Sequence, residues 1–337
     1  ARKRGRQGKD RKKTGPPCGA PARRVSASSA GRTQITVVPP REKAGKVHPK
    51  TESSAYPPSA VLKVQGDREY EIARLVARGG MGVVYEARER NCERFVAVKL
   101  INGQAMGRRE DVSRFIQEAK ITSQLEHPNI VPVHDLGNDV GRMAYYTMKY
   151  VQGVTLTDAL HGIREGKLDM IERFPLERLL TVFQKVCDAV AFAHSRGIVH
   201  CDLKPGNVMI GSYGEVLVLD WGLAHPVHET AALSSRSAEM RVDKLGTGKS
   251  GRRILGTPGF MAPEQAHLGL APIDARTDIY ALGAILYSIL TLRSPVKGKT
   301  LAEVLRKIVA GDVVPPAAYN HWEGVKGDEA LRFPHCS

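Results

Sequence analysis

The sequence predicts an α+β protein with two lobes. Short apolar runs rich in β-branched residues recur through residues 68–151, whereas apolar residues at helical spacing dominate residues 152–312. One amphipathic pattern, at about residues 109–125, interrupts the strands of the first part. We therefore expect a small antiparallel lobe of five strands and one helix, followed by a mainly helical large lobe.

Positive charge is concentrated at the start of the chain. The formal net charge of the 337 residues is +15, and the first fifty residues hold fifteen Lys or Arg and two acidic residues, so they supply 13 of those charges. Residues 1–65 are rich in Pro, Gly and Ser, with residues 35–38 as the one strand-like patch, which predicts a disordered basic tail. Such a tail would contact a polyanion such as nucleic acid, acidic protein or an anionic membrane. The alternative is a tail that only keeps the protein soluble.

Cysteine usage and the apolar runs favour a cytoplasmic location. The five cysteines are odd in number, widely spaced and without a C-x-x-C pair, so neither a disulfide framework nor a zinc site is expected. Residues 1–30 lack the apolar core of a signal peptide. The longest apolar run, residues 281–292, is shorter than the about 20 residues that cross a bilayer, so no membrane segment is expected.

Three polar residues that suit phosphate chemistry flank a predicted hairpin. Residues 208–210 and 216–219 are short β-branched runs, and the glycines between them predict a tight turn. The hairpin would bring Asn207 and Asp220 to one end, where their oxygens could hold a hard divalent cation such as Mg²⁺. Asp202 would stand close enough to accept a proton.

These residues give the chain a resemblance to the protein kinase family. Residues 200–207, His-Cys-Asp-Leu-Lys-Pro-Gly-Asn, are similar to the catalytic loop H-R-D-L-x-x-x-N, and Asp220-Trp221-Gly222 is similar to D-F-G. Lys204 is typical of serine/threonine kinases, and residues 220–224 resemble the bacterial, eukaryotic-like members. The resemblance covers about residues 68–312. It implies a two-lobed protein-kinase-like fold, ATP and Mg²⁺ as cofactors, and a protein substrate that carries a Ser or Thr hydroxyl.

A glycine-rich turn separates the first two predicted strands, residues 70–76 and 83–87. Glycines let the backbone approach phosphate oxygens and point N–H groups at them, although an ordinary hairpin would show the same pattern. The kinase pattern G-x-G-x-x-G-x-V is matched in part, because alanine replaces its first glycine. The resemblance assigns nucleotide binding to this loop, at Ala77, Gly79, Gly80, Gly82 and Val84.

A lysine interrupts the apolar run at residues 95–100. Burying Lys99 would be costly unless its ammonium meets an anion, and the alternative is an edge strand whose lysine faces water. Glu118, 19 residues further on, falls on the predicted helix. In kinases the matching lysine binds the α- and β-phosphates and pairs with the matching glutamate, so the resemblance assigns these roles to Lys99 and Glu118.

Two further strands, at residues 130–133 and 143–151, complete the predicted small lobe. The resemblance places Met148 behind the adenine pocket and Tyr150 and Val151 in the linker that meets adenine, and it adds Ala97 to the nucleotide-binding residues. Met148 would fit a plain core position equally well.

The large lobe is predicted to contain helices at residues 175–195, 278–292 and 301–310. Residues 220–264 form a long segment without strong periodicity, which indicates a functional loop. In the resemblance it is the activation segment, which ends in Ala-Pro-Glu and contains the catalytic hydroxyl of Thr257. Asp278 either caps its helix or, as in kinases, binds the backbone of the catalytic loop.

Beyond residue 312 the sequence shows no closing helices. We therefore expect a large lobe that is truncated at its C-terminal end, with residues 313–337 irregular. Glu264 would then lack the arginine that pairs with it in kinases. The oligomeric state is not indicated by the sequence.

The combined expectation is a serine/threonine protein kinase. Asp202 would orient and deprotonate the acceptor hydroxyl, Lys204 would neutralise developing charge, and Asn207 and Asp220 would hold Mg²⁺. The alternative is a pseudokinase that binds nucleotide or acts as a scaffold, and Cys201 in place of the motif's arginine favours it. Because a thiol cannot pair with a phosphate as a guanidinium does, Cys201 also predicts that activity depends little on phosphorylation of residues 230–250.

Overall fold

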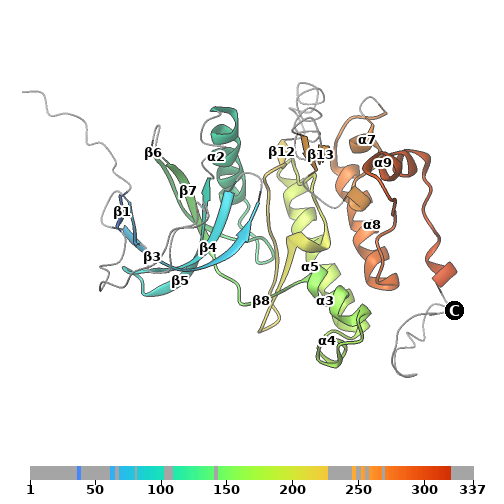
Figure 1. The fold of residues 1–337 in the computed structure, drawn as a ribbon, viewed down its shortest axis with the longest axis horizontal. Helices are drawn as coiled ribbons and strands as arrows, with labels where there is room; N and C mark the ends of the chain where they lie inside the picture. The colour runs from blue at the N-terminus through green and yellow to red at the C-terminus, as the bar shows by residue number, and fades with distance from the viewer. Residues whose placement is uncertain are drawn as a thin grey trace, which may run out of the picture. The chain divides into compact units, whose positions relative to one another are not determined.

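The computed structural model describes residues 36–38, 61–64, 68–79, 82–101, 109–139, 143–226, 245–247, 252–254, 258–267 and 270–319. Strands gather in the first part of this range and helices in the second, so the predicted two-lobed arrangement is confirmed (Figure 1). The strands are β1 Thr36–Val38, β2 Val61–Val64, β3 Arg68–Arg78, β4 Gly82–Glu89, β5 Arg94–Ile101, β6 Val133–Asp139, β7 Met143–Lys149, β8 Gly153–Thr155, β9 Ile198–Val199, β10 Val208–Gly211, β11 Val216–Val218, β12 His225–Pro226, β13 Leu245–Thr247 and β14 Arg252–Ile254.

Among the described residues, helices are joined by three short 3₁₀ turns. They are α2 Arg109–Gln124, α3 Leu156–Arg164, α4 Leu168–Arg173, α5 Leu176–Ser195, α7 Pro263–Ala266, α8 Ala275–Thr291 and α9 Leu301–Ala310, with 3₁₀ turns η1 Pro205–Asn207, η3 Pro258–Phe260 and η4 Pro316–Tyr319.

The small lobe is one antiparallel sheet in the order β1-β2-β3-β4-β5-β7-β6. Four of the five predicted strands are present in it, as β3, β4, β5 and β7. Strands β1 and β2 extend the sheet beyond β3, so regular structure begins earlier than the predicted start near Tyr70, and β1 falls on the strand-like patch of the basic segment. Helix α2 packs on β6 and β7, where Phe115 contacts the ring of Tyr146.

The prediction of a strand at residues 130–133 is wrong. Ladder pairing starts only at Val133, directly after Pro132, which has no N–H to donate. Ile130 instead makes an isolated parallel bridge to Val218 of the large lobe, with Val218 N–H donating to the Asn129 carbonyl at 2.8 Å. The segment that follows α2 is thereby attached to the hairpin formed by β10 and β11.

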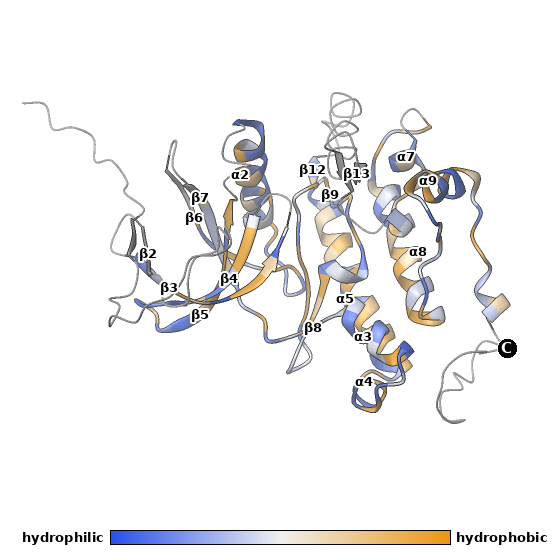
Figure 2. Cartoon of the chain, in the orientation of Figure 1, coloured by the Kyte–Doolittle hydropathy of each residue, from blue (hydrophilic) through white to orange (hydrophobic). Residues whose placement is uncertain are grey.

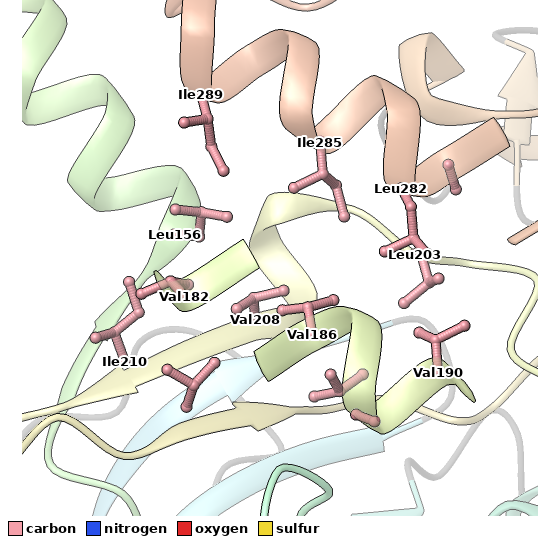
Figure 3. Close-up of a cluster of buried hydrophobic side chains, with 14 of the residues drawn as sticks. Leu156, Val182, Val186, Val190, Leu203, Val208, Ile210, Leu282, Ile285 and Ile289 are labelled. Carbon is pink, nitrogen blue, oxygen red and sulfur yellow. The ribbon is translucent and has the colours of Figure 1, made fainter. Parts of the chain in front are cut away.

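Helices α5 and α8 form the centre of the large lobe. Both carry long apolar faces (Figure 2). Their buried side chains meet those of α3, β10 and the segment before β10 (Figure 3), and the labelled members of this cluster are Leu156, Val182, Val186, Val190, Leu203, Val208, Ile210, Leu282, Ile285 and Ile289. This core fixes the backbone on both sides of residues 200–207.

Helix α8 begins three residues earlier than predicted because its N-cap is Asp274. The Asp274 carboxylate accepts a hydrogen bond from the Arg276 N–H, which satisfies one of the free donors of the first turn. Asp278 is therefore inside the helix and available for another role. Helix α9 has the predicted bounds, from its cap at Thr300 to the left-handed Gly311. No helix within the described residues is long and apolar enough to cross a membrane.

Candidate active site

The predicted ion pair between Lys99 and Glu118 is present. Lys99 Nζ lies 2.5 Å from Glu118 Oε1, between the central strand β5 and helix α2. The Glu118 side chain is 1% exposed and that of Lys99 14%, so the ammonium is inside the lobe and the edge-strand alternative is wrong. Burial favours the neutral form of Lys99, but the carboxylates of Glu118 and Asp220 outweigh it and raise its pKa well above the usual value. Lys99 therefore stays charged.

The three polar residues around the hairpin also come together. Lys204 Nζ donates to Asp202 Oδ2 at 2.7 Å, and the Asn207 side-chain amide donates to the Asp202 main-chain carbonyl at 2.8 Å. The Leu219 N–H donates to the Asn207 carbonyl at 2.8 Å, which places the residue before Asp220 against the end of the catalytic loop. The antiparallel pairing of β10 and β11 sets this meeting, as the sequence predicted.

Asp220 faces the small lobe. Its Oδ1 lies 3.8 Å from Lys99 Nζ, and its side chain is 48% exposed. The next residue but one, Gly222, has little room for a side chain, because a Cβ there would lie 3.1 Å from Glu118 Oε2 and 3.2 Å from Asp220 Oδ1. A glycine at position 222 thus lets the two carboxylates approach the same lysine.

Asp278 binds the backbone of the catalytic loop. Its Oδ2 accepts from the His200 N–H at 2.8 Å and from His194 Nε2, also 2.8 Å away, while Oδ1 accepts from the Cys201 N–H at 2.9 Å. The side chain is 1% exposed. Of the two roles that the sequence left open for Asp278, loop binding is the one observed.

Two residues that depart from the kinase motifs, Cys201 and Trp221, lie next to the catalytic aspartates. Cys201 has a left-handed backbone, with φ of 64°, and its Sγ lies 3.7 Å from His225 Nδ1. Trp221 is buried, with its ring centroid 4.5 Å from that of His200. Both departures from the kinase motifs are packed into the lobe.

The glycine-rich turn is closed by a hydrogen bond from the Gly79 N–H to the Gly82 carbonyl at 2.8 Å. Ala77 pairs with Val84 across β3 and β4. Packing requires a glycine at position 82, since a Cβ there would lie 2.6 Å from the Leu100 carbonyl oxygen of β5. Gly80 of this turn lies outside the described residues. Thr257, which was predicted to supply a catalytic hydroxyl, lies outside them as well.

The predicted adenine-side residues gather at the end of the sheet. Ala97 is buried in β5 and pairs with Met148 of β7, and Val151 follows as a buried linker residue. Tyr150 OH accepts from Arg74 Nη2 at 2.6 Å, and Arg74 Nε donates to Glu86 Oε2 at 2.6 Å. The linker is thus attached to strands β3 and β4.

Four side chains that contact the residues above had no signal in the sequence. Tyr146 OH donates to Glu118 Oε1 at 2.6 Å, and the Gln265 side chain donates to the Cys201 carbonyl at 2.8 Å. Thr277 Oγ1 donates to Glu264 Oε1 at 2.6 Å, so Glu264, which was expected to lack the arginine partner found in kinases, is held by a hydroxyl of α8. The fourth is His194, the partner of Asp278.

The charges of the site suit a metal–polyphosphate ligand. Lys99 and Lys204 face the carboxylates of Glu118, Asp202 and Asp220, so these five side chains sum to one negative charge. A divalent cation would make the sum positive, which favours polyphosphate. The Asn207 side-chain nitrogen donates to the Asp202 carbonyl, so the side-chain oxygen is the atom that can bind a cation. The Asp220 carboxylate could bind the same cation.

A fold and site of this kind define a protein kinase domain, and the chain belongs to that family, with residues 70–326 matching it. Among curated proteins it is 42% identical over 257 residues to serine/threonine-protein kinase PknD of Protochlamydia amoebophila, which covers 73% of this chain and 25% of that protein. It is 39% identical over 258 residues to PknD of Chlamydia trachomatis serovar D, covering 74% of this chain and 27% of that protein. For PknD of Chlamydia felis the identity is 40% over 251 residues, covering 69% of this chain and 25% of that protein. The chain thus spans about a quarter of the length of these relatives.

Proposed function

We propose that the chain is an ATP-dependent serine/threonine protein kinase, which transfers the γ-phosphoryl group of ATP to a Ser or Thr hydroxyl of a protein. The observation that carries this proposal is that one ammonium, Lys99 Nζ, lies 2.5 Å from Glu118 and 3.8 Å from Asp220. A buried lysine between a fixed carboxylate and a more exposed one is suited to bind phosphate oxygens without a large rearrangement. The relatives named serine/threonine-protein kinases support the same class of reaction.

The catalytic loop supplies the acceptor side. The Asp202 carboxylate, held by Lys204 and by the fixed backbone around it, would accept the hydroxyl proton as the acceptor oxygen attacks phosphorus. The Lys204 ammonium lies 2.7 Å from that carboxylate, where it would offset negative charge that develops on the transferred group. Thr257 is proposed to bond near both residues.

The nucleotide side combines the two lobes. Lys99, held by Glu118, would bind the α- and β-phosphates, and the turn that includes Ala77, Gly79, Gly80, Gly82 and Val84 would cover them. Asn207 and Asp220 would hold Mg²⁺, which when bound neutralises phosphate charge. Ala97, Met148, Tyr150 and Val151 would border the adenine ring.

The second candidate is a pseudokinase that binds nucleotide or a partner without turnover. Cys201 favours it, because this residue occupies the position of the motif's arginine. The retained Lys99, Asp202, Asn207 and Asp220 argue for catalysis, since each performs a separate chemical task. A cytoplasmic location stays a prediction from the cysteine usage.

Magnesium-dependent transfer of labelled phosphate from ATP to a protein acceptor tests the proposal. Asp202→Ala and Lys99→Met should each lower turnover by at least about a hundredfold, since a positioned general base and an electrostatic clamp contribute effects of that size or more. The matched control is Asp169→Asn, on the exposed face of α4, which should leave turnover unchanged. Equal incorporation by wild type and Asp202→Ala would contradict the kinase assignment.

A further inference from the structure

A tyrosine shares the carboxylate oxygen that holds Lys99. Tyr146 OH donates to Glu118 Oε1 at 2.6 Å, and Lys99 Nζ lies 2.5 Å from the same atom. Both hydrogen bonds are shielded from water, because Tyr146 is 4% and Glu118 2% exposed. The ion pair is therefore a triad of lysine, glutamate and tyrosine.

Strand register produces this triad. Lys99 of β5 is directly opposite Tyr146 of β7, and directly opposite residues of antiparallel strands place their side chains on the same face of the sheet. That face packs on α2, where the Tyr146 ring lies 5.2 Å from the ring of Phe115. Lys99 Nζ lies 5.5 Å from the Tyr146 ring centroid, within the range of a cation–π contact. These ring contacts hold the phenol in place independently of the hydrogen bond that its hydroxyl makes.

The hydroxyl acts as a permanent donor. Burial raises the pKa of Tyr146 well above its usual value, and the negative charge of Glu118 raises it further, so the phenol keeps its proton. Within the described residues Glu118 Oε2 has no hydrogen-bond partner, so Oε1 carries both bonds that orient this carboxylate. Removing either bond leaves the buried Glu118 carboxylate with a single hydrogen bond in place of two.

We propose that Tyr146 is a positioning residue for nucleotide binding, which holds Glu118 toward the sheet so that Lys99 already points at the phosphate site when nucleotide arrives. The inference rests on the proposed kinase function. Lys99 must divide its hydrogen bonds between Glu118 and the phosphates once nucleotide is bound. At that stage the phenol is the one donor of the triad that serves Glu118 alone.

Tyr146→Phe tests the proposal because it removes one oxygen and keeps the ring. The adjacent Tyr145 gives a matched control: it is 3% exposed, and its hydroxyl also donates to a carboxylate, Asp135 Oδ2, at 3.1 Å. Tyr145 belongs to a different buried cluster, that of β3, β4 and β5. Tyr145→Phe therefore removes a tyrosine-to-carboxylate hydrogen bond that lies away from Lys99.

We expect Tyr146→Phe to lower kcat/KM for ATP by at least about tenfold, equivalent to about 1.4 kcal/mol, with KM for the protein acceptor changed less than about twofold. Calorimetric affinity for magnesium ADP should fall as well. Tyr145→Phe should stay within about twofold of wild type in all three quantities. In a Glu118→Gln background, Tyr146→Phe should add less than about threefold, since the tyrosine acts through that carboxylate.

Three results would overturn the inference. They are wild-type kinetics for Tyr146→Phe, equal losses in Tyr145→Phe and Tyr146→Phe, or a full additional loss in the Glu118→Gln background. A wild-type chain that binds magnesium ADP without phosphate transfer would contradict the proposed function alone, and ADP affinity would still decide on Tyr146. A wild-type chain that binds no nucleotide would overturn both.

Discussion

The side-chain amide of Gln265 donates a hydrogen bond to the main-chain carbonyl of Cys201 at 2.8 Å. Its own oxygen accepts from the Ala262 N–H at 3.0 Å, so the orientation of the amide is fixed. The Cys201 N–H is held in turn by Asp278 Oδ1 at 2.9 Å. Both polar groups of a left-handed residue are thus bonded directly before Asp202. A left-handed backbone at a residue other than glycine costs about 1–3 kcal/mol, and these bonds offset that cost.

We expect Gln265→Met to lower kcat by at least about tenfold while KM for ATP changes little. Methionine fills the same space but cannot donate, so Cys201 can leave the left-handed conformation and carry Asp202 with it. The unfolding free energy should fall by about 1–3 kcal/mol, the cost of an unpaired buried polar group. Steady-state kinetics and urea denaturation give both quantities.

Ser288→Ala is the control for Gln265→Met. The Ser288 hydroxyl is buried in α8 and donates to the Ala284 carbonyl at 3.0 Å, so its loss also removes a buried hydrogen bond. Its kcat should stay within about twofold of wild type. If both variants lose kcat equally, general destabilisation explains the effect and the link from Gln265 to the catalytic loop is wrong.

The cap of α8 should give a pH-dependent stability. Hydrogen bonds from Arg276 lower the pKa of Asp274 below its ordinary value of about 3.9, so its ionised form stabilises the fold. This contribution is complete above the unfolded pKa and is lost as the pH falls through the folded pKa. At pH 7 Asp274→Asn should cost less than about 1 kcal/mol, because Asn also caps helices and the ion pair with Arg276 is exposed.

Denaturation of wild type and Asp274→Asn from pH 7 to pH 3 measures this effect, and an NMR titration of the Asp274 carboxyl gives the folded pKa directly. The difference between the two proteins should shrink as the pH falls below about 4. Arg276→Gln should remove the same increment. A difference that stays constant over the whole range, or a folded pKa at the ordinary value, would refute the assignment.

Activity should depend little on phosphorylation of residues 230–250. Cys201 replaces the arginine that would bind such a phosphate, and the loop around it is held by Asp278 and Gln265 instead. Turnover of phosphatase-treated protein would be compared with that of protein allowed to autophosphorylate. A rise of more than about tenfold, equivalent to about 1.4 kcal/mol of barrier, would mean that another group binds the phosphate.

The basic segment should bind polyanions in a salt-dependent way. Eleven Lys or Arg residues lie in residues 1–33, so affinity for heparin or single-stranded DNA should fall steeply between 50 and 200 mM salt, as counterion release requires. Deleting these residues should remove most of the binding and spare kinase turnover. Truncating there keeps β1, which pairs with β2. Unchanged polyanion affinity after the deletion would place the contact elsewhere.

The sequence predicted the residues whose motifs are local. Asp202, Lys204 and Asn207 lie within six residues of one another, and Asp220 is brought to them by one hairpin, so their proximity follows from short-range structure. Lys99 could be recognised because an ammonium in an apolar strand requires an anion. These arguments need no knowledge of distant packing.

The residues that escaped prediction make contacts set by tertiary structure. Tyr146 reaches Glu118 through the register between β5 and β7, and Gln265 meets Cys201 across 64 positions of chain. Neither residue is unusual in its own surroundings, since a tyrosine suits a strand and a glutamine suits a short helix. The strand prediction for Ile130 fails for the same reason, because its β-branched side chain fits a strand as well as it fits the bridge to Val218.

Asp220 has a positive φ of 57°, a conformation that glycine adopts freely and aspartate adopts at some expense. Stability alone would therefore favour another residue at this position. The fold tolerates this conformational cost, and the Asp220 carboxylate faces Lys99. Chemistry, and not folding stability, therefore explains why an aspartate occupies this position. We expect Asp220→Gly to match or exceed the melting temperature of wild type while losing phosphate transfer. Such a thermally robust, inactive variant would serve for trapping substrate complexes.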